Sequence, residues 1–194
     1  NKIDLKKDLK AFFQPSAKVV TLVDVPMFKF IMTDGAIEPG MEPGNSPRFQ
    51  DDLQAMYGAG YTLKFMMKKR ETDPVDYPVM ALEGLWDVVD GSFDFEIKDN
   101  WIYTLMILVP DLITQEDFNE ALSQLKVKKG DLPEFDRLRL ETFQEGLCVQ
   151  TMHIGPYATE PETLQRMKAF MAEQGLRDLV GEGGSNGYVR STPA

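Results

Sequence analysis

The residues with the clearest chemical potential lie in one segment near the middle of the chain, where aromatic and acidic side chains are interleaved. The aromatic residues are Trp86, Phe93, Phe95, Trp101 and Tyr103, and the carboxylates are Glu83, Asp87, Asp90, Asp94, Glu96 and Asp99. Aromatic faces beside a carboxylate in a partly desolvated cleft bind flat, apolar or cationic compounds through stacking and cation–π attraction. The competing interpretation is that the aromatic residues fill a core while the acids solvate turns. Composition alone leaves both open.

Glu83 is the carboxylate whose position favours a site. It lies inside the apolar run Pro78–Trp86, in line with Val79, Ala81 and Leu85. A carboxylate at such a position must be paired, hydrated in a pocket or held in its protonated form. Exposure on an edge strand is the competing explanation.

The chain is also rich in methionine, with 11 in all. Met66, Met67, Met80, Met106 and Met152 offer adaptable apolar surface of the kind that promiscuous binding sites use. The commoner role of methionine is to fill irregular gaps in a core, and that role stays open here.

Histidine and cysteine are each present once, as His153 and Cys148, which narrows the chemistry. A single cysteine cannot form an internal disulfide, and a single histidine cannot build a multi-histidine zinc centre. The sequence contains no glycine-rich phosphate loop, nucleophile elbow, His-Glu-x-x-His or Cys-x-x-Cys motif. We therefore expect no metal and no cofactor. His153 lies in a strand pattern just before Gly155 and Pro156, which favours local hydrogen bonding over a role as catalytic base.

Composition places the chain among ordinary globular proteins. Its 194 residues are 43% hydrophobic and 27% charged, which excludes disordered, collagen-like and disulfide-dense classes. With 21 basic and 31 acidic residues the formal net charge is −10, so direct binding to DNA or RNA is not expected. No stretch approaches the ~20 apolar residues of a membrane helix, and the charged N-terminus lacks a signal-peptide core. A cytoplasmic location is the resulting expectation.

The elements that must position the candidate residues follow from hydrophobic periodicity and turn chemistry. Residues 1–18 are expected to be a solvated lead-in. Strands are predicted over 19–23, 28–33, 61–67, 78–86, 101–109, 138–143 and 147–154. One helix is predicted to begin at Ser46–Pro47 and to end at Gly58 and Gly60. Two more are predicted to begin at the capping boxes Thr114–Asp117 and Thr159–Glu162.

The order of these elements favours an α+β fold. Strands outnumber helices and several are adjacent, which is typical of an antiparallel sheet rather than a doubly wound parallel one. Segment 28–35 and segment 147–155 are each followed by a loop and a helix, which indicates a duplicated unit. We predict a single domain over 19–194, built from two strand–helix–strand–strand pseudo-repeats at about 19–90 and 100–194.

Three segments, Trp101–Ile107, Glu145–Tyr157 and Glu162–Leu164, resemble the GyrI-like small-molecule-binding domain family. This family also forms the drug-binding half of multidrug-sensing transcription regulators. The most specific part of the resemblance is the His-Ile-Gly-Pro-Tyr turn, followed by a capped helix. The resemblance covers nearly the whole chain and implies tandem repeats, an antiparallel sheet with helices on one side, and a central ligand cleft. It also implies binding of bulky aromatic or cationic molecules and, for stand-alone members, hydrolysis of cyclopropane-bearing cytotoxins.

The chain departs from the family pattern near its end. Such proteins usually finish with a His-Glu-Ile-Tyr strand whose Glu projects into the cleft, and Gly184–Arg190 offers no counterpart. We therefore assign Glu83 as the water-orienting base, with Tyr157 and Tyr103 as donors to the developing oxyanion. The ligand-binding residues are predicted to be Trp86 and Trp101 as walls, with Phe65, Met106 and His153.

Two functions follow from these observations. The first is binding of bulky hydrophobic, aromatic or cationic small molecules, with hydrolytic ring opening of cyclopropane-containing cytotoxins. The alternative is non-enzymatic inhibition of DNA gyrase or another topoisomerase through protein–protein contact, for which a net charge of −10 over 194 residues is a dilute mimic of DNA. Saturable binding of a cationic dye favours the first, and dose-dependent inhibition of supercoiling favours the second. A homodimer is a further expectation.

Overall fold

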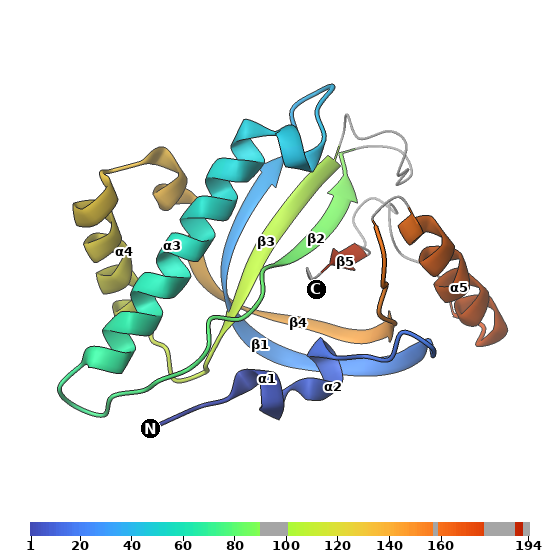
Figure 1. Ribbon diagram of the computed structural model, residues 1–194, viewed down its shortest axis with the longest axis horizontal. Helices are drawn as coiled ribbons and strands as arrows, with labels where there is room; N and C mark the ends of the chain where they lie inside the picture. The colour runs from blue at the N-terminus through green and yellow to red at the C-terminus, as the bar shows by residue number, and fades with distance from the viewer. Residues whose placement is uncertain (90–100, 157–158, 177–188, 192–194) are drawn as a thin grey trace.

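The computed structural model describes residues 1–89, 101–156, 159–176 and 189–191. One antiparallel sheet organises the chain, with strand order β4-β1-β3-β2-β5. The strands are β1 (Thr21–Ala36), β2 (Glu83–Val88), β3 (Trp101–Val109), β4 (Arg139–Gln150) and β5 (Val189–Ser191). The helices are α1 (Leu5–Asp8), α2 (Lys10–Phe13), α3 (Pro47–Lys69), α4 (Gln115–Lys129) and α5 (Glu160–Glu173), with short 3-10 turns at Pro43–Asn45 and Pro133–Arg137. The predicted α+β class with antiparallel pairing is confirmed (Figure 1).

Strand β1, an interior strand of the sheet, is longer than its sequence pattern predicts. The sequence predicts separate strands over 19–23 and 28–33, and over 138–143 and 147–154, but β1 and β4 each run on as single strands. Their pairing passes from Val25↔Gly146 to Met27↔Gln144, so Pro26 lies in the ladder with Gly146 at a φ of 75° beside it. Because proline lacks an N–H and a positive φ favours glycine, both strands bend here together. The sheet consequently curls toward α5, as Figure 1 shows.

Helix α3 begins where the sequence predicts and ends much later. Ser46 is its N-cap, accepting a hydrogen bond from the Phe49 N–H, and Pro47 occupies the first turn. The predicted stop at Gly58 and Gly60 is wrong, and the strand predicted over 61–67 is helical. Both glycines are packing positions, because a Cβ on Gly58 would lie 3.4 Å from Leu125 and one on Gly60 would lie 3.5 Å from Val79.

Helix α4 confirms the predicted capping box. The Thr114 hydroxyl accepts from the Asp117 N–H, and the Asp117 carboxylate accepts from the Thr114 N–H at 2.9 Å. Helix α5 begins near the predicted residue, but Thr159 makes no side-chain cap; its hydroxyl instead donates to the Pro156 carbonyl.

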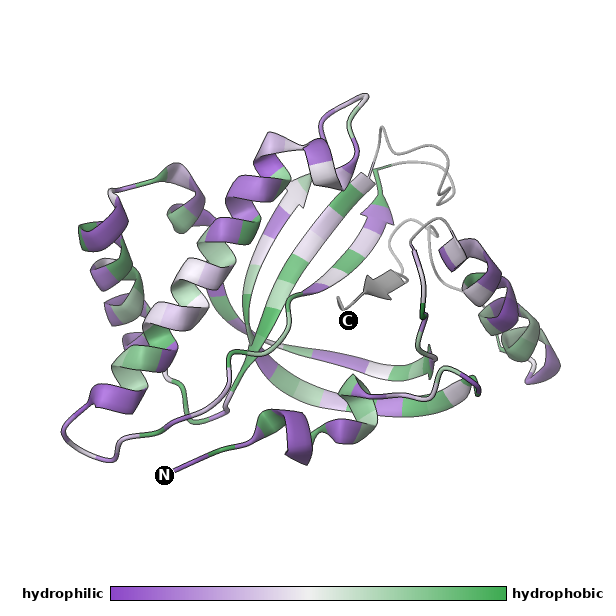
Figure 2. Cartoon of the chain, in the orientation of Figure 1, coloured by the Kyte–Doolittle hydropathy of each residue, from purple (hydrophilic) through white to green (hydrophobic). Residues whose placement is uncertain are grey.

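The sheet separates two apolar clusters, one on each face. On the side we call the helix face, Ile31, Tyr103, Leu105 and Ile107 pack toward α3, which in turn packs on α4. On the other side, which we call the Glu83 face, Phe30, Met32, Leu85, Met106 and Leu108 form a second cluster with Leu5 of α1. Figure 2 shows hydrophobic residues along the middle of β1 and β3, where the two clusters meet. The N-terminal segment therefore contributes to the interior, and helices lie on both faces rather than one.

The tandem duplication stays a prediction. Within the predicted first repeat, 19–90, the described residues supply β1, α3 and β2, and β3, which pairs between β1 and β2, falls in the predicted second repeat. In the second half, the described residues supply β4, α5 and the three-residue β5, with α4 preceding them. No helix in the described ranges is long and apolar enough to cross a membrane.

Candidate functional site

Glu83 begins β2 and lies opposite Met106 of β3. Glu83 is only 1% exposed, although its side chain is a carboxylate. Successive strand residues point to opposite faces, so Glu83 shares a face with Leu85 and with Met106, both members of the second apolar cluster. A buried carboxylate in apolar surroundings is costly, and such groups gather at functional sites. Glu83 is therefore the described acid whose setting most resembles a site.

One cross-strand row connects Glu83 to the far side of the sheet. Met106 pairs with Glu83 and with Met32, and Met32 pairs with Arg139 of β4. Three strand spacings separate the two ends of the row, so the ends lie about 14 Å apart. The row consequently has two buried methionines in its middle and a charged group at each end.

The Arg139 end of the row carries more negative than positive charge. Arg139 pairs with Asp34 at 2.9 Å and with Glu141 at 2.6 Å. Asp34 also accepts a 2.7 Å hydrogen bond from the Thr104 hydroxyl. Counting Glu83, the row and the two ion-pair partners of Arg139 hold three carboxylates against one guanidinium, an arrangement that attracts cations rather than anions.

The predicted aromatic residues gather on the helix face instead. Trp86 lies 5.5 Å from Trp101 and 5.7 Å from Tyr103 between ring centroids, and Phe49 of α3 lies 5.1 Å from Tyr103 edge to face. Trp101 and Tyr103 are buried in the first apolar cluster, with Trp86 packed against it. The structure therefore does not bring Trp86, Trp101 and Tyr103 together with Glu83, because the sheet separates them.

The Tyr103 hydroxyl has a structural partner. It donates a 2.8 Å hydrogen bond to Asp52 of α3, which is fully buried and also binds the guanidinium groups of Arg48 and Arg137. Burial and the Asp52 carboxylate raise the pKa of Tyr103 well above its usual value, so the phenol stays protonated. Gly35 leaves room for the Tyr103 side chain to extend to Asp52, since a Cβ at position 35 would lie 2.2 Å from the Tyr103 hydroxyl.

His153 lies elsewhere, beside a hollow of about 250 Å³ between the end of β4 and α5. Its Nδ1 is 2.8 Å from the Thr163 hydroxyl, and its Nε2 is 3.2 Å from the Pro156 carbonyl oxygen. The strand predicted over 147–154 ends at Gln150, so these contacts join the segment that follows β4 to α5, as local hydrogen bonding predicts. Met152, Glu162 and Arg166 also line the hollow.

The remaining predicted site residues divide by position. Met106 lies beside Glu83 and is completely buried. Phe65 is 45% exposed on the outer side of α3, stacked on Tyr61. Tyr157 lies outside the described residues. Among the described residues, no group of three or more His, Cys, Asp or Glu side chains could hold a metal ion.

Sequence reasoning missed the charged groups that organise both faces. Arg48 and Asp52 are spaced i, i+4 on one helix, a pattern that predicts an ion pair. Arg137 immediately precedes the strand predicted over 138–143 and Arg139 lies at its start, and nothing in their spacing indicates partners on α3 or β1. Those partners depend on strand register, which the sequence does not specify.

Three solved structures from Listeria innocua are similar to this chain. An uncharacterized conserved protein shares 33% identity with a TM-score of 0.85, covering 98% of this chain and 89% of its own. A hydrolase shares 32% identity with a TM-score of 0.81, covering 98% and 92%. A hydrolase encoded by lin2189 shares 35% identity with a TM-score of 0.78, covering 93% and 85%. No protein-family model and no curated protein matches the chain.

Proposed function

The chain belongs to the same family as these Listeria innocua proteins, and we propose that it binds bulky hydrophobic, aromatic or cationic small molecules at its Glu83 face and hydrolyses a strained ring in them. Two of the similar structures are of hydrolases, which supports hydrolysis as the reaction class. The GyrI-like resemblance supports the ligand class and, within it, cyclopropane-bearing cytotoxins as substrates.

The observation that carries this proposal is the burial of Glu83 on an apolar sheet face. The residue is 1% exposed, and its cross-strand neighbour Met106 is fully buried. A carboxylate in such a setting is desolvated, so its interaction with a ligand cation or a polarised water is stronger than at the surface. The methionines of the row supply polarizable surface that adapts to flat ligands of different shape.

The excess of carboxylates at the two ends of this row supports the cationic part of the ligand class. Glu83, Asp34 and Glu141 outnumber Arg139, and the ends of the row lie about 14 Å apart. A polycyclic cation of that length would span the methionines with its charge near a carboxylate. Leu5, Leu9 and Phe13 of the N-terminal segment pack on the same cluster, so a ligand reaches the row by displacing part of this cover.

The proposed reaction is addition of water to a cyclopropane conjugated to a carbonyl. The water oxygen bonds to the ring CH₂ as one ring carbon–carbon bond breaks, and that electron pair moves through the conjugated system to the carbonyl oxygen. Glu83 takes one proton from the water and the new phenolate receives it, while the other proton stays on the new hydroxyl. General-base assistance of this kind is worth about 10²–10⁴-fold in rate.

The donor to the developing oxyanion is assigned to Tyr157 alone. Tyr103 lies on the helix face and its hydroxyl is bound to Asp52. Trp86 and Trp101 lie on that face as well, so in this proposal they pack against the opposite side of the sheet and do not contact the ligand.

A turnover assay with a neutral cyclopropane-containing DNA alkylator tests the proposal. Glu83→Gln keeps the shape and removes the charge, so ligand binding by calorimetry should persist while turnover falls by about 10²–10⁴-fold. Glu120→Gln, an exposed carboxylate of α4, is the matched control and should turn over like the parent. Equal rates for Glu83→Gln and the parent would overturn the assignment of Glu83. A parent that does not exceed the uncatalysed rate would remove hydrolysis.

Binding of tetraphenylphosphonium tests the ligand class separately. The parent should bind it saturably, and Glu83→Gln should weaken it by about tenfold because the desolvated charge is lost. Absence of saturable binding up to the solubility limit would contradict the proposed ligand class, whatever the turnover assay shows.

A further inference from the structure

The outer side of α3 carries a line of aromatic rings, which we call the aromatic stripe: Tyr57, which is partly buried, and the exposed Tyr61 and Phe65. Successive rings are 6.4 Å apart between centroids, and the Tyr61 and Phe65 planes differ by 23°. Tyr61 is 51% exposed and Phe65 45% exposed. Rings spaced four residues apart lie on one side of a helix, so the stripe is one continuous apolar ridge.

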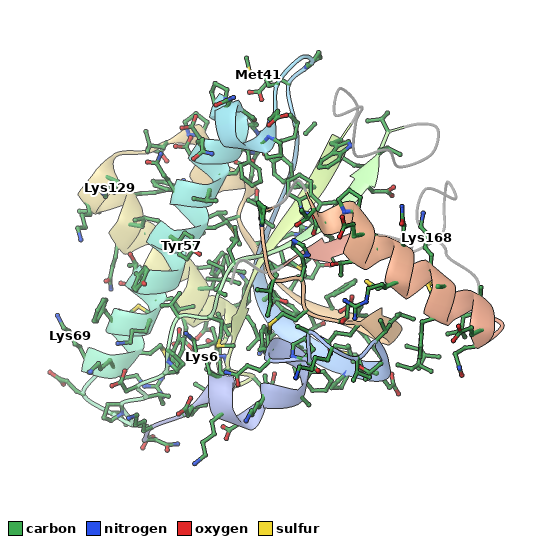
Figure 3. All side chains as sticks on the ribbon, turned by 45° about the vertical axis from the view of Figure 1, so that its right-hand side comes forward. Lys6, Met41, Tyr57, Lys69, Lys129 and Lys168 are labelled. Atoms are coloured by element: carbon green, nitrogen blue, oxygen red, sulfur yellow. The ribbon has the colours of Figure 1, made fainter. Side chains whose placement is uncertain are left out.

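Some charged side chains beside the stripe have ion-pair partners among the described residues and others do not. Lys64 and Lys68 both pair with Asp76, at 3.1 Å and 2.7 Å. Asp51 near the beginning of α3 and Lys69 at its end are exposed, and their side chains form no ion pair or hydrogen bond within the described ranges. Figure 3 shows Tyr57 near the middle of this helix and Lys69 at its carboxyl end.

Helix geometry places these two charges in register with each other. An α-helix has 3.6 residues per turn, so the 18 positions from Asp51 to Lys69 make five full turns and about 27 Å. Both side chains therefore leave α3 on the same side of the stripe. The midpoint between them is position 60, next to Tyr61.

We propose that a second copy of this chain docks on the aromatic stripe. The α3 helices of the two copies lie antiparallel and are related by a two-fold axis that passes level with position 60. In that arrangement Asp51 of each copy faces Lys69 of the other, and both pairs form together. The rings alternate between copies along the shared axis, about 3 Å of rise apart, which is close to the thickness of one ring. A stripe facing itself in this way is self-complementary, as a two-fold interface requires.

The area of the stripe sets the strength of this dimer. Each aromatic side chain has about 150–250 Å² of surface, so the four half-exposed rings of Tyr61 and Phe65 in two copies supply roughly 400 Å². A stable interface buries about 1,200–2,000 Å² in total, so polar residues of α3 must supply most of the remainder. We therefore expect a dissociation constant on the order of micromolar rather than nanomolar.

Sedimentation equilibrium of the full chain, from micromolar to submillimolar concentration at low salt, tests the proposal by charge exchange. Asp51→Lys sets two lysines against each other in both pairs, and Lys69→Asp does the same with two aspartates. Each should weaken dimerisation by about tenfold or more. The double variant Asp51→Lys with Lys69→Asp restores opposite charges and should recover the parent dissociation constant to within about threefold.

One control and one further variant keep the outcome interpretable. Asp24→Lys makes the same charge change at an exposed position of β1 and should leave dimerisation unchanged. Tyr61→Ser removes the central ring from an exposed position, so the fold should persist by circular dichroism while dimerisation is lost. A chain that stays monomeric throughout overturns the proposal. A dimer that ignores the single reversals, or that the double exchange fails to restore, overturns it equally.

Discussion

Tyr103 and Glu83 illustrate what single residues can and cannot reveal. Both have the chemistry of a catalytic pair, yet a sheet lies between them. Their faces follow from strand alternation, because Glu83 and Trp86 are three positions apart and Trp86 pairs with Tyr103. The sequence therefore identified the candidate side chains, and the three-residue spacing of Glu83 and Trp86 already indicated that they lie on opposite faces of the sheet. The sequence did not predict the pairing that places Met106 beside Glu83, because register depends on distant strands.

The hydroxyl of Tyr103 should matter for stability and not for turnover. Tyr103→Phe keeps the ring and leaves buried Asp52 without one of its donors, which should cost about 1.5–3 kcal/mol of unfolding free energy. Urea denaturation measures this loss. Turnover of the folded variant should stay within about twofold of the parent.

Tyr77→Phe is the matched control for this experiment. Tyr77 is 3% exposed, and its hydroxyl has no hydrogen-bond partner among the described residues. Removing it should be neutral or slightly stabilising. Equal losses in the two variants would contradict a structural role for the Tyr103–Asp52 hydrogen bond.

Among the elements, α3 depends on how its first turn is anchored. Ser46 donates its hydroxyl to Glu38 while accepting from the Phe49 N–H, and the Arg48 N–H donates to Glu38 at 3.0 Å. The Ser46 hydroxyl, and then the Arg48 N–H, hold the pKa of Glu38 below its usual value of 4.5. Because the folded pKa is depressed, this contribution to stability is present above about pH 4.5 and is lost as the pH falls through the folded pKa.

Glu38→Gln tests that anchor through its pH dependence. The thermal midpoint of the variant should lie below that of the parent at pH 7, and the gap should close as the pH falls below about 4.5. Glu71→Gln, which removes an exposed carboxylate after α3, is the comparison. A gap of constant size across this range would contradict the assignment.

Element prediction succeeded where local signals determine the outcome and failed where distant contacts do. The capping box of α4, the start of α3 and the whole of β3 are local, and each was predictable. Gly58 and Gly60 indicate a helix end in isolation, but Leu125 and Val79 pack against them and α3 continues. Tertiary contact overrides propensity at such positions.

At the scale of the whole molecule, the first residues close an apolar face formed much later in the chain. Leu5 is 9% exposed within the cluster of Phe30, Met32, Leu85 and Met106, and the Ile3 N–H donates to the Asp76 carbonyl at 2.9 Å. The segment predicted as a solvated lead-in thus covers the proposed ligand row. Ligand entry and N-terminal packing should therefore be coupled.

Leu5→Ala should loosen this cover and lower the unfolding free energy by about 2 kcal/mol. Binding of an apolar fluorescent dye should rise, and tetraphenylphosphonium should associate faster than with the parent. Val127→Ala, at a residue 90% exposed on α4, should change none of these quantities. A loss of stability with unchanged association of tetraphenylphosphonium, or neither change, would show that α1 is not the cover.

The position of β1 in the sheet has a consequence for synthesis on the ribosome. One edge of this strand pairs with β3, but the other pairs with β4, where Met32 meets Arg139 and Thr21 meets Gln150. At about 5–20 residues per second, the ribosome needs on the order of ten seconds to make the chain between these partners. During that interval the longest strand carries an unpaired edge that another nascent chain can join. Elongation speed and chaperone supply should therefore govern the yield of native protein more than the stability of the finished sheet.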